Sequence, residues 1–402
     1  MTPSIAKPRI GLVYGDYPPN PPARIDGGSD FLRRLAEGLV ARGHEVTAIV
    51  SSRADRPHPF VADSGVRIEP VIRDWTLSGA LGGQLRAVRT VLNENSIDVV
   101  HLIYPDPFLR YGSDSYHLPF LLKPGTRKPL VVTFFGFGVS GAGIVAKTGL
   151  LSLFAVADRI VITDADLLTR FKRTLPWWAA KARGGLVGSI AEAAYPTWSY
   201  EALGDRKFAV GLQPARRYIG FFGFWSPDKG LENLFEAVRR LRMAGHDANL
   251  VLIGGRAPAV RLEHEHALLR LAEDLGIREA VIDTGPLSPV EVAQYMVAMD
   301  VCALPFKVNP LGRSSLALAL ELGVPVAVTR PAGEGAALLA GLELLETPDP
   351  DRIVAAITRL LEDPAAQSAT AAAAAHAARH WSWDAIIGEY EALYAELVAR
   401  PQ

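Results

Sequence analysis

Two short segments in the second half of the chain carry cationic side chains in positions suited to phosphate. The first, residues 222–231, contains Gly223, Ser226 and Lys229. A short apolar run at 218–222 precedes it and a helical pattern at 231–242 follows it, so it predicts a loop between a strand and a helix. The N–H groups and dipole of a helix start favour anions, and a lysine adds a point charge. An ordinary surface lysine on such a loop is the alternative interpretation.

The second segment, residues 309–315, lies between a strand pattern at 301–305 and a helical pattern at 316–322. An arginine with two hydroxyl groups at a helix start forms another candidate anion site, and simple capping of the helix by Ser314 is the alternative. Two such sites in one domain predict a site for a diphosphate. Neither segment matches a Walker loop or a G-x-G-x-x-G loop, which disfavours an ATPase or a dehydrogenase. The residues of interest are Asn309, Gly312, Arg313, Ser314 and Ser315.

A third candidate contact is the glycine pair Gly27-Gly28, which precedes a helical pattern at 31–41. Glycine lets a ligand approach the backbone closely, although the pair could also merely close a loop. Around it, the order strand, loop, helix, strand over residues 9–50 indicates a βαβ unit and therefore a parallel sheet. Residues 218–253 repeat this pattern after a polar stretch at 200–214, which is expected to be a linker. The chain is thus predicted to hold two doubly wound α/β domains.

Composition limits the classes of protein that remain. The chain has 402 residues, 49% of them hydrophobic, which is enough for two cores. A single cysteine, Cys302, lies in an apolar run and fits a small buried side chain in a reducing compartment. There is no visible secretory signal or membrane-length apolar run, so a cytoplasmic location is expected. The net charge is +6 for residues 1–200 and −7 for the remainder, a weak indication of an anionic partner for the first half.

Short motifs along the chain resemble the family 4 glycosyltransferases, and the resemblance runs nearly end to end. The first half carries it in 17–19 (YPP), 27–28 (GG), 35–50, 98–101 (DVVH), 131–133 (VVT) and 157–161 (ADRIV). The second half carries it in Gly223, 229–230 (KG), Gly285, 313–316 (RSSL), 323–326 (GVPV) and 381–383 (WSW). The 313–316 segment is similar to a subgroup with arginine, a small residue and serine at this point.

The resemblance implies the GT-B fold, in which two Rossmann-like doubly wound domains face each other across a cleft. An N-terminal acceptor domain is expected at residues 1–200 and a nucleotide-sugar domain at 215–380. Residues 381–402 are expected to form a helix that crosses back onto the first domain. The implied activity is transfer of a sugar from a nucleotide-diphosphate sugar to an acceptor hydroxyl, a reaction of EC 2.4 type with retention of configuration.

In this scheme Lys229 and Arg313 are the catalytic candidates, because they would neutralise charge on the leaving diphosphate. No metal and no cofactor are expected beyond the nucleotide-sugar co-substrate. The acceptor is expected to be a carbohydrate, a lipid-linked compound or a small molecule. The expected donor contacts are Gly27, Gly28, Gly223, Ser226, Asn309, Gly312, Ser314 and Ser315. The acceptor-side candidates are Tyr17, His101, Tyr104 and Phe135.

Some positions depart from the family pattern. Many members have histidine where Phe135 stands, and Phe224 replaces a common arginine after the glycine. The Glu-x7-Glu acids would fall at Pro310 and Leu318. These departures keep open an alternative function, in which a protein of the same fold binds a nucleotide sugar for regulation and transfers little or none.

Two further segments have a structural and a functional interpretation. The D-x-D pattern at 164–166 matches a metal-binding motif of another glycosyltransferase fold, but charge at a helix start explains it better. Residues 171–183 mix basic side chains with Trp177 and Trp178, which could contact an anionic membrane or a charged acceptor. Ordinary surface packing is the alternative. No pattern for nucleic-acid binding is present.

Overall fold

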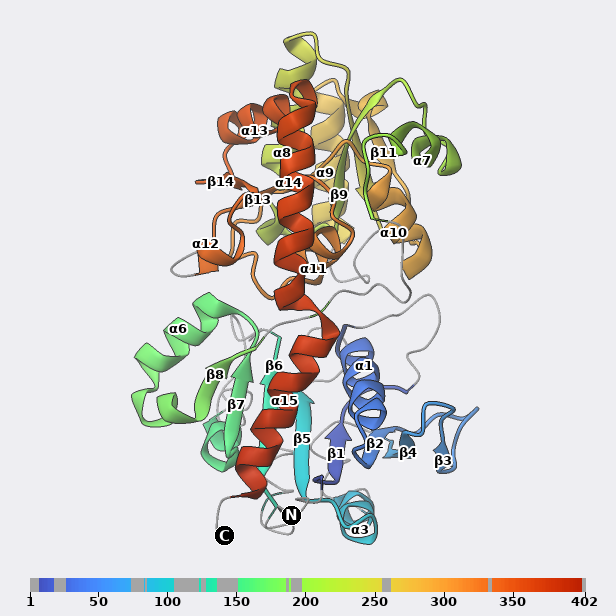
Figure 1. The fold of residues 1–402 in the computed structure, drawn as a ribbon, viewed down its shortest axis with the longest axis vertical. Coiled ribbons are helices and arrows are strands. Elements are labelled where there is room, and N and C mark those ends of the chain that lie inside the picture. The colour runs from blue at the N-terminus through green and yellow to red at the C-terminus, as the bar shows by residue number, and fades with distance from the viewer. Residues whose placement is uncertain are drawn as a thin grey trace, which may run out of the picture. The chain divides into compact units, whose positions relative to one another are not determined.

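The computed structural model describes residues 7–17, 27–73, 83, 85–104, 123, 128–135, 151–185, 188, 197–254, 262–331 and 335–399. The chain divides into two compact units. Unit 1 comprises Met1–Leu186 together with Trp383–Gln402, and unit 2 comprises Val187–Ser382. Each unit is built on one sheet with helices packed against it (Figure 1).

Unit 1 has an eight-stranded sheet in the order β3-β4-β2-β1-β5-β6-β7-β8. All its strand pairs are parallel except β3 with β4. The order reverses between β1 and β5, so this sheet is doubly wound, as predicted. The strands are β1 (Ile10–Val13), β2 (Val46–Ser51), β3 (Phe60–Val61), β4 (Arg67–Ile72), β5 (Val99–Tyr104), β6 (Leu130–Phe134), β7 (Arg159–Ile162) and β8 (Ala182–Gly184). The helices are α1 (Gly27–Ala41), α3 (Leu85–Glu94), α6 (Ala165–Thr174), η3 (Pro176–Lys181) and α15 (Trp383–Val398).

Unit 2 has a six-stranded parallel sheet in the order β11-β10-β9-β12-β13-β14. Its order reverses between β9 and β12, which confirms the second doubly wound domain. The strands are β9 (Arg217–Phe222), β10 (Ala248–Ile253), β11 (Val281–Asp283), β12 (Val301–Leu304), β13 (Val326–Thr329) and β14 (Glu343–Leu345). The helices are α7 (Leu203–Ala209), η4 (Pro227–Lys229), α8 (Leu231–Met243), α9 (Leu262–Asp274), η6 (Arg278–Ala280), α10 (Pro289–Val297), α11 (Ser314–Glu321), α12 (Gly335–Leu338), α13 (Pro350–Glu362), α14 (Pro364–Ala377) and η7 (Ala378–Trp381).

The amphipathic helix α15 completes the core of unit 1, although it follows unit 2 in the chain (Figure 1). It packs on α1 and on β5. Phe31 of α1 lies between two of its rings, 5.5 Å from Trp383 and 5.8 Å from Tyr390, measured between ring centroids. The predicted return of the last helix to the first half of the chain is therefore present within unit 1.

A buried polar network joins α15 to the middle of the sheet. His101 on β5 has no exposed surface, and its Nδ1 lies 2.6 Å from the hydroxyl of Tyr394. Its Nε2 lies 2.8 Å from Oγ1 of Thr133, which in turn lies 2.8 Å from the hydroxyl of Tyr390. Burial lowers the pKa of His101 to about 3, so the imidazole is neutral in the folded protein.

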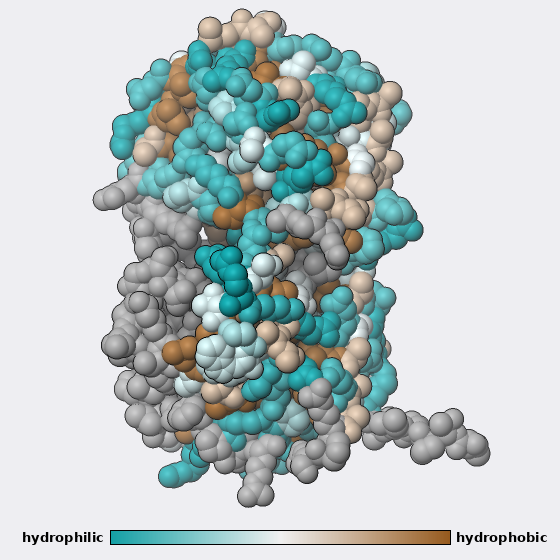
Figure 2. All heavy atoms as spheres, turned by 90° about the vertical axis from the view of Figure 1, so that its left-hand side faces the viewer, coloured by the Kyte–Doolittle hydropathy of each residue, from teal (hydrophilic) through white to brown (hydrophobic). Residues whose placement is uncertain are grey.

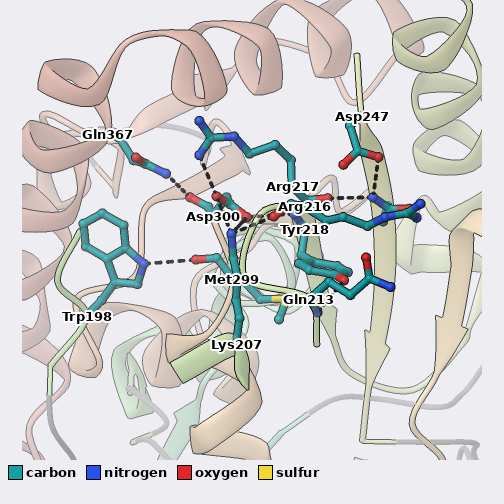
Figure 3. A network of polar contacts seen from close by, with 11 residues as sticks. Trp198, Lys207, Gln213, Arg216, Arg217, Tyr218, Asp247, Met299, Asp300 and Gln367 are labelled. Atoms are coloured by element: carbon teal, nitrogen blue, oxygen red, sulfur yellow. Dashed lines mark hydrogen bonds and ion pairs between the residues drawn. The ribbon is translucent and has the colours of Figure 1, made fainter. Parts of the chain in front are cut away.

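The segment at 200–214 is not the plain linker that its polar composition predicted. It contains α7, and Lys207 of that helix is 2% exposed. The ammonium of Lys207 lies 2.8 Å from Oδ2 of Asp300, whose side chain is fully buried (Figure 3). The same carboxylate accepts from Arg217 at 3.0 Å and from the backbone N–H of Tyr218 at 2.7 Å. This buried ion pair explains why the polar segment at 200–214 is a packed part of unit 2.

The strands β3, β4 and β14 were also missed by the sequence interpretation. They include charged residues such as Arg67 and Glu343, and β3 has only two residues. Cys302 is fully buried in β12, as expected of a small apolar side chain.

We expect Lys207→Met to lower the free energy of unfolding of unit 2 by about 3 kcal/mol, because it leaves a buried carboxylate with one cation fewer. Urea unfolding followed by tryptophan fluorescence measures this change. Asp351→Asn is the control, since it breaks an exposed pair with Arg240 and should cost less than about 0.5 kcal/mol. A loss as small as that of the control in Lys207→Met would show that Arg217 alone satisfies Asp300.

We expect acid to destabilise unit 1 through His101. Its pKa is lower in the folded state than the 6.5 of an unperturbed histidine, so the unfolded chain takes up the proton first. The stabilisation is therefore complete above about pH 6.5 and decreases by about 2 kcal/mol between pH 7 and pH 5. Urea unfolding across this range should show a smaller decrease for His101→Gln than for the wild type.

Candidate functional site

Both predicted anion-binding segments lie at the same edge of the sheet of unit 2. The loop after β9 contains η4 and leads into α8, and the loop after β12 leads into α11. β9 and β12 pair directly with each other, with Val301 opposite Ile219. In doubly wound sheets, ligands bind at the carboxyl ends of the strands where the order reverses. The two loops therefore occupy the position in unit 2 that such folds use for ligands.

The loop after β9 is held in one conformation by its glycines and by a buried tryptophan. Gly230 has a φ of +71°, and a Cβ on it would lie 2.1 Å from the carbonyl oxygen of Pro305. Only glycine fits there, because the loop after β12 passes against the start of α8. Trp225 is fully buried, and the N–H of Lys229 donates to the carbonyl of Ser226 at 2.9 Å. Lys229 is thus placed at a fixed point before α8.

Lys229 and Arg313 meet at one carboxylate, that of Asp228. Its Oδ2 lies 3.9 Å from Nζ of Lys229 and 3.8 Å from Nη1 of Arg313. The Lys229 ammonium also lies 4.6 Å from the centroid of the Phe306 ring, in a cation–π contact. The side chain of Lys229 is 12% exposed and that of Arg313 is 27% exposed. The structure therefore brings the two catalytic candidates together, from separate loops, at one point.

Asp228 is ionised at this site. Burial by itself would raise the pKa of its carboxyl group, but the charge of Lys229, a hydrogen bond from Ser226 and the charge of Arg313 outweigh burial and lower the pKa. Asp228 was not selected from the sequence as a site residue. The signal that would have identified Asp228 is its place directly before Lys229 at a helix start, where an acid is usually read as helix charge.

The loop after β12 presents the start of α11. Arg313 occupies the N-cap position without a side-chain capping bond, and Ser314 is the first residue of the helix. Capping by Ser314, the alternative interpretation, is therefore not how this helix begins. Gly312 has a φ of +79°. Asn309 is 5% exposed, and its Oδ1 accepts from the N–H of Leu311 at 3.1 Å, so it shapes the loop.

Two of the residues that depart from the family pattern, Leu318 and Phe224, lie in unit 2. Leu318 is fully buried in α11, where an acid in its place would lose hydration. Phe224 is 48% exposed beside Gly223, whose φ is +141°. Ser315 is 4% exposed, and Ser226 donates to Asp228. Two of the predicted donor contacts therefore already have neighbours within unit 2, because Ser315 is buried and Ser226 hydrogen-bonds to Asp228.

In unit 1, α1 begins at the glycine pair, and its first turn packs closely against Tyr14. A Cβ on Gly28 would lie 2.4 Å from Cε1 of Tyr14, so only glycine lets the first turn approach this ring. Ser29 in the same turn accepts from the N–H of Asp16 at 3.1 Å. Residues 18–26 and 105–119 lie outside the described residues.

Three of the four acceptor-side candidates are buried in unit 1. His101 is enclosed by Thr133 and the tyrosines of α15. Tyr17 is 5% exposed, its hydroxyl donates to Glu37 at 2.8 Å, and burial raises its pKa to about 12. Tyr104 is 2% exposed and packs on Phe134, with 4.5 Å between ring centroids.

Phe135, the fourth candidate, is half-buried. Its ring lies edge-on to Phe31, with 5.1 Å between centroids. Phe31 also contacts the rings of α15. A phenylalanine at position 135 thus adds apolar contact to the junction of β6, α1 and α15, where an imidazole would place polar atoms.

The D-x-D segment serves as the start of a helix, as expected. Asp164 is the N-cap of α6, and its carboxylate accepts from the N–H of Leu167 at 2.9 Å. Within the described ranges, no three His, Cys, Asp or Glu residues come together in a way that could hold a metal ion. In the same part of the chain, no helix has the length and apolar character needed to cross a membrane.

Comparisons with known proteins agree with this architecture. Residues 205–381 match the family model described as glycosyl transferases group 1, and residues 26–174 match that of the glycosyl transferase 4-like domain. The chain is 26% identical over 385 residues to the GDP-mannose-dependent alpha-(1-6)-phosphatidylinositol monomannoside mannosyltransferase of Mycolicibacterium smegmatis, covering 93% of each chain. It is 32% identical over 197 residues to the D-inositol 3-phosphate glycosyltransferase of Corynebacterium urealyticum, covering 48% of this chain and 46% of that one.

Two solved structures of similar fold are glycosyltransferase-like in architecture. Sucrose-phosphate synthase from Thermosynechococcus elongatus has a TM-score of 0.75 and 19% identity, covering 98% of this chain and all of that one. Anabaena HepE in complex with UDP and glucose has a TM-score of 0.71 and 15% identity, covering 96% of this chain and all of that one. The chain therefore has the GT-B fold, with a region that matches the glycosyl transferase 4-like domain followed by one that matches the glycosyl transferases group 1 domain.

Proposed function

We propose that this protein transfers a sugar from a nucleotide-diphosphate sugar to an acceptor hydroxyl and that unit 2 binds the nucleotide and its diphosphate. The observation that carries the proposal is the meeting of Lys229 and Arg313 at the carboxyl ends of β9 and β12. Two cations from separate loops suit a ligand with two linked phosphates better than a single anion.

In the proposed reaction, negative charge develops on the diphosphate as the bond to the sugar breaks. Lys229 and Arg313 neutralise this charge, and the N–H groups at the start of α11 add fixed dipoles. The Phe306 ring keeps the Lys229 ammonium near the site without neutralising it. These groups supply the stabilisation that a divalent metal provides in other transferases, so we propose a metal-independent reaction. Retention of configuration is proposed from the family resemblance.

The relatives narrow the choice of donor and acceptor to be tested. The name of the Mycolicibacterium relative specifies GDP-mannose as donor and a phosphatidylinositol mannoside as acceptor. GDP-mannose is therefore our first candidate donor. We propose that unit 1 receives the acceptor, which is a carbohydrate, a small molecule or a lipid-linked compound.

Unit 1 has a surface that fits contact with an anionic membrane or a lipid-linked acceptor. On α6 and η3, Trp177 is 76% exposed, and the side chains of Arg170, Lys172 and Arg173 are also exposed. α6 lies on the left-hand side of Figure 1, which faces the viewer in Figure 2, where hydrophilic residues cover much of the drawn face. A basic helix with an exposed tryptophan binds an interface through charge and through the ring.

We expect wild-type protein to transfer sugar from one member of a panel of nucleotide sugars and to bind that nucleoside diphosphate far better than the nucleoside. Lys229→Ala and Arg313→Gln should each weaken diphosphate binding by about 10- to 100-fold, the loss of one charge-assisted contact. Nucleoside binding should change little. Calorimetric titration and product analysis measure these effects.

Arg359→Gln is the control, because Arg359 pairs with Glu343 at the end of α13. Equal losses of affinity for the nucleoside and the nucleoside diphosphate in Lys229→Ala would show that Lys229 does not bind phosphate. Donor binding without turnover against broad acceptors would instead support the alternative, a nucleotide-sugar-binding or regulatory protein.

We expect the α6–η3 surface to bind vesicles that contain an anionic phospholipid. Trp177→Ala combined with Lys172→Gln and Arg173→Gln should reduce the bound fraction several-fold, because each basic residue near an anionic surface adds about 1 kcal/mol. Co-sedimentation with anionic and with neutral vesicles measures this. Equal binding of both vesicle types, or of both proteins, would show that this surface does not contact lipid. Transfer to a water-soluble acceptor should stay unchanged.

A further inference from the structure

A negative charge lies within the site that is proposed to bind a diphosphate. The Oδ2 atom of Asp228 is 3.9 Å from the Lys229 ammonium and 3.8 Å from the Arg313 guanidinium. These separations exceed the 2.7–2.9 Å of a short charge-assisted hydrogen bond. One carboxylate oxygen thus lies near both cations without a tight bond to either of them.

Asp228 is itself fixed in place by its surroundings. Its Oδ1 accepts from the hydroxyl of Ser226, and its backbone carbonyl accepts from the N–H of Lys307 at 2.9 Å. The ammonium of Lys307 also pairs with Glu232 in the first turn of α8, at 3.0 Å. Because Ser226 and Lys307 come from the two loops of the site, the carboxylate belongs to the junction of these loops and cannot swing far from the cations.

An anion at this point has two effects. With the site empty, it offsets the repulsion between Lys229 and Arg313, which would otherwise approach each other as like charges. With a diphosphate bound, it repels the ligand, because both carry negative charge near the same two cations. A site selected only for tight binding of phosphate would have a neutral residue here.

We propose that Asp228 is an internal counter-ion that competes with the diphosphate for Lys229 and Arg313 and thereby speeds release of the nucleoside diphosphate product. The inference rests on the proposed function, since it requires that these two cations bind the diphosphate. In the empty site Asp228 stays between the cations, and during turnover it keeps the product from being held too firmly.

The test compares nucleoside diphosphate binding by wild type, Asp228→Asn and Asp228→Glu. We expect Asp228→Asn to bind the diphosphate about five-fold more tightly, through slower dissociation, because one unit charge next to the ligand is removed. Asp228→Glu keeps the charge and should resemble the wild type. Raising the salt concentration should reduce the difference between Asp228→Asn and wild type, since the effect is electrostatic. Calorimetry and stopped-flow displacement measure affinity and dissociation rate.

Asp351→Asn is the matched control, because it also removes one carboxylate from unit 2. Asp351 pairs with Arg240, which is nine residues after Leu231 on α8 and thus about 14 Å farther along the helix. This variant should bind the diphosphate as the wild type does. Asp228→Ala provides a second neutral variant if Asp228→Asn does not fold, and it should change the affinity in the same direction.

Weaker or unchanged binding by the neutral variants would overturn the counter-ion role, and weaker binding would make Asp228 a residue that positions the cations. A salt-independent gain would overturn it as well. If wild-type protein does not prefer the nucleoside diphosphate to the nucleoside, the proposed function of the site itself is wrong. The wild-type comparison thus separates failure of the function from failure of the inference.

Discussion

β9 and β12 lie side by side in the sheet of unit 2, although β10 and β11 come between them in the chain. This pairing determines what the unit can bind. Each strand delivers a loop and a helix start to the same edge, so Lys229 and Arg313 reach one carboxylate from segments far apart in sequence. Gly230 then permits the close approach of the two loops at Pro305. Without the reversal of strand order between β9 and β12, the cations would lie at separate places on the sheet.

The alternation of strand and helix patterns was sufficient to predict both doubly wound sheets, and the family resemblance predicted that α15 returns to unit 1. Buried parallel strands such as β1 and β10 are continuous apolar runs, which makes them easy to recognise. The two cationic loops could also be predicted from local sequence, since each contains at least one glycine and a basic residue close to the start of a helix. The edge strands β3 and β14 and the helix α7 could not, because tertiary contacts stabilise them more than local pattern does.

The role of single side chains was harder to predict than their position in the chain. His101 lies on β5, a central strand of the sheet, but Tyr390 and Tyr394 arrive from the other end of the sequence and enclose it. The basic excess of residues 1–200 has a similar explanation in part. Arg42 and Arg159 pair with Asp384 and Glu396 of α15, so some of the positive charge is matched by the chain's own last helix.

The place of α15 has a consequence for the synthesis of the chain. Residues 1–186 leave the ribosome long before 383–398, so β5 and α1 have no partner for Phe31 and His101 while unit 2 is being made. The apolar surface that α15 covers in the folded unit is then exposed to solvent, and His101 lacks its hydrogen bond with Tyr394. Such exposed apolar surface makes the nascent unit prone to association with other chains. Unit 2 is contiguous and is able to complete its core first. The half of the protein that is translated first is therefore the half that finishes folding last.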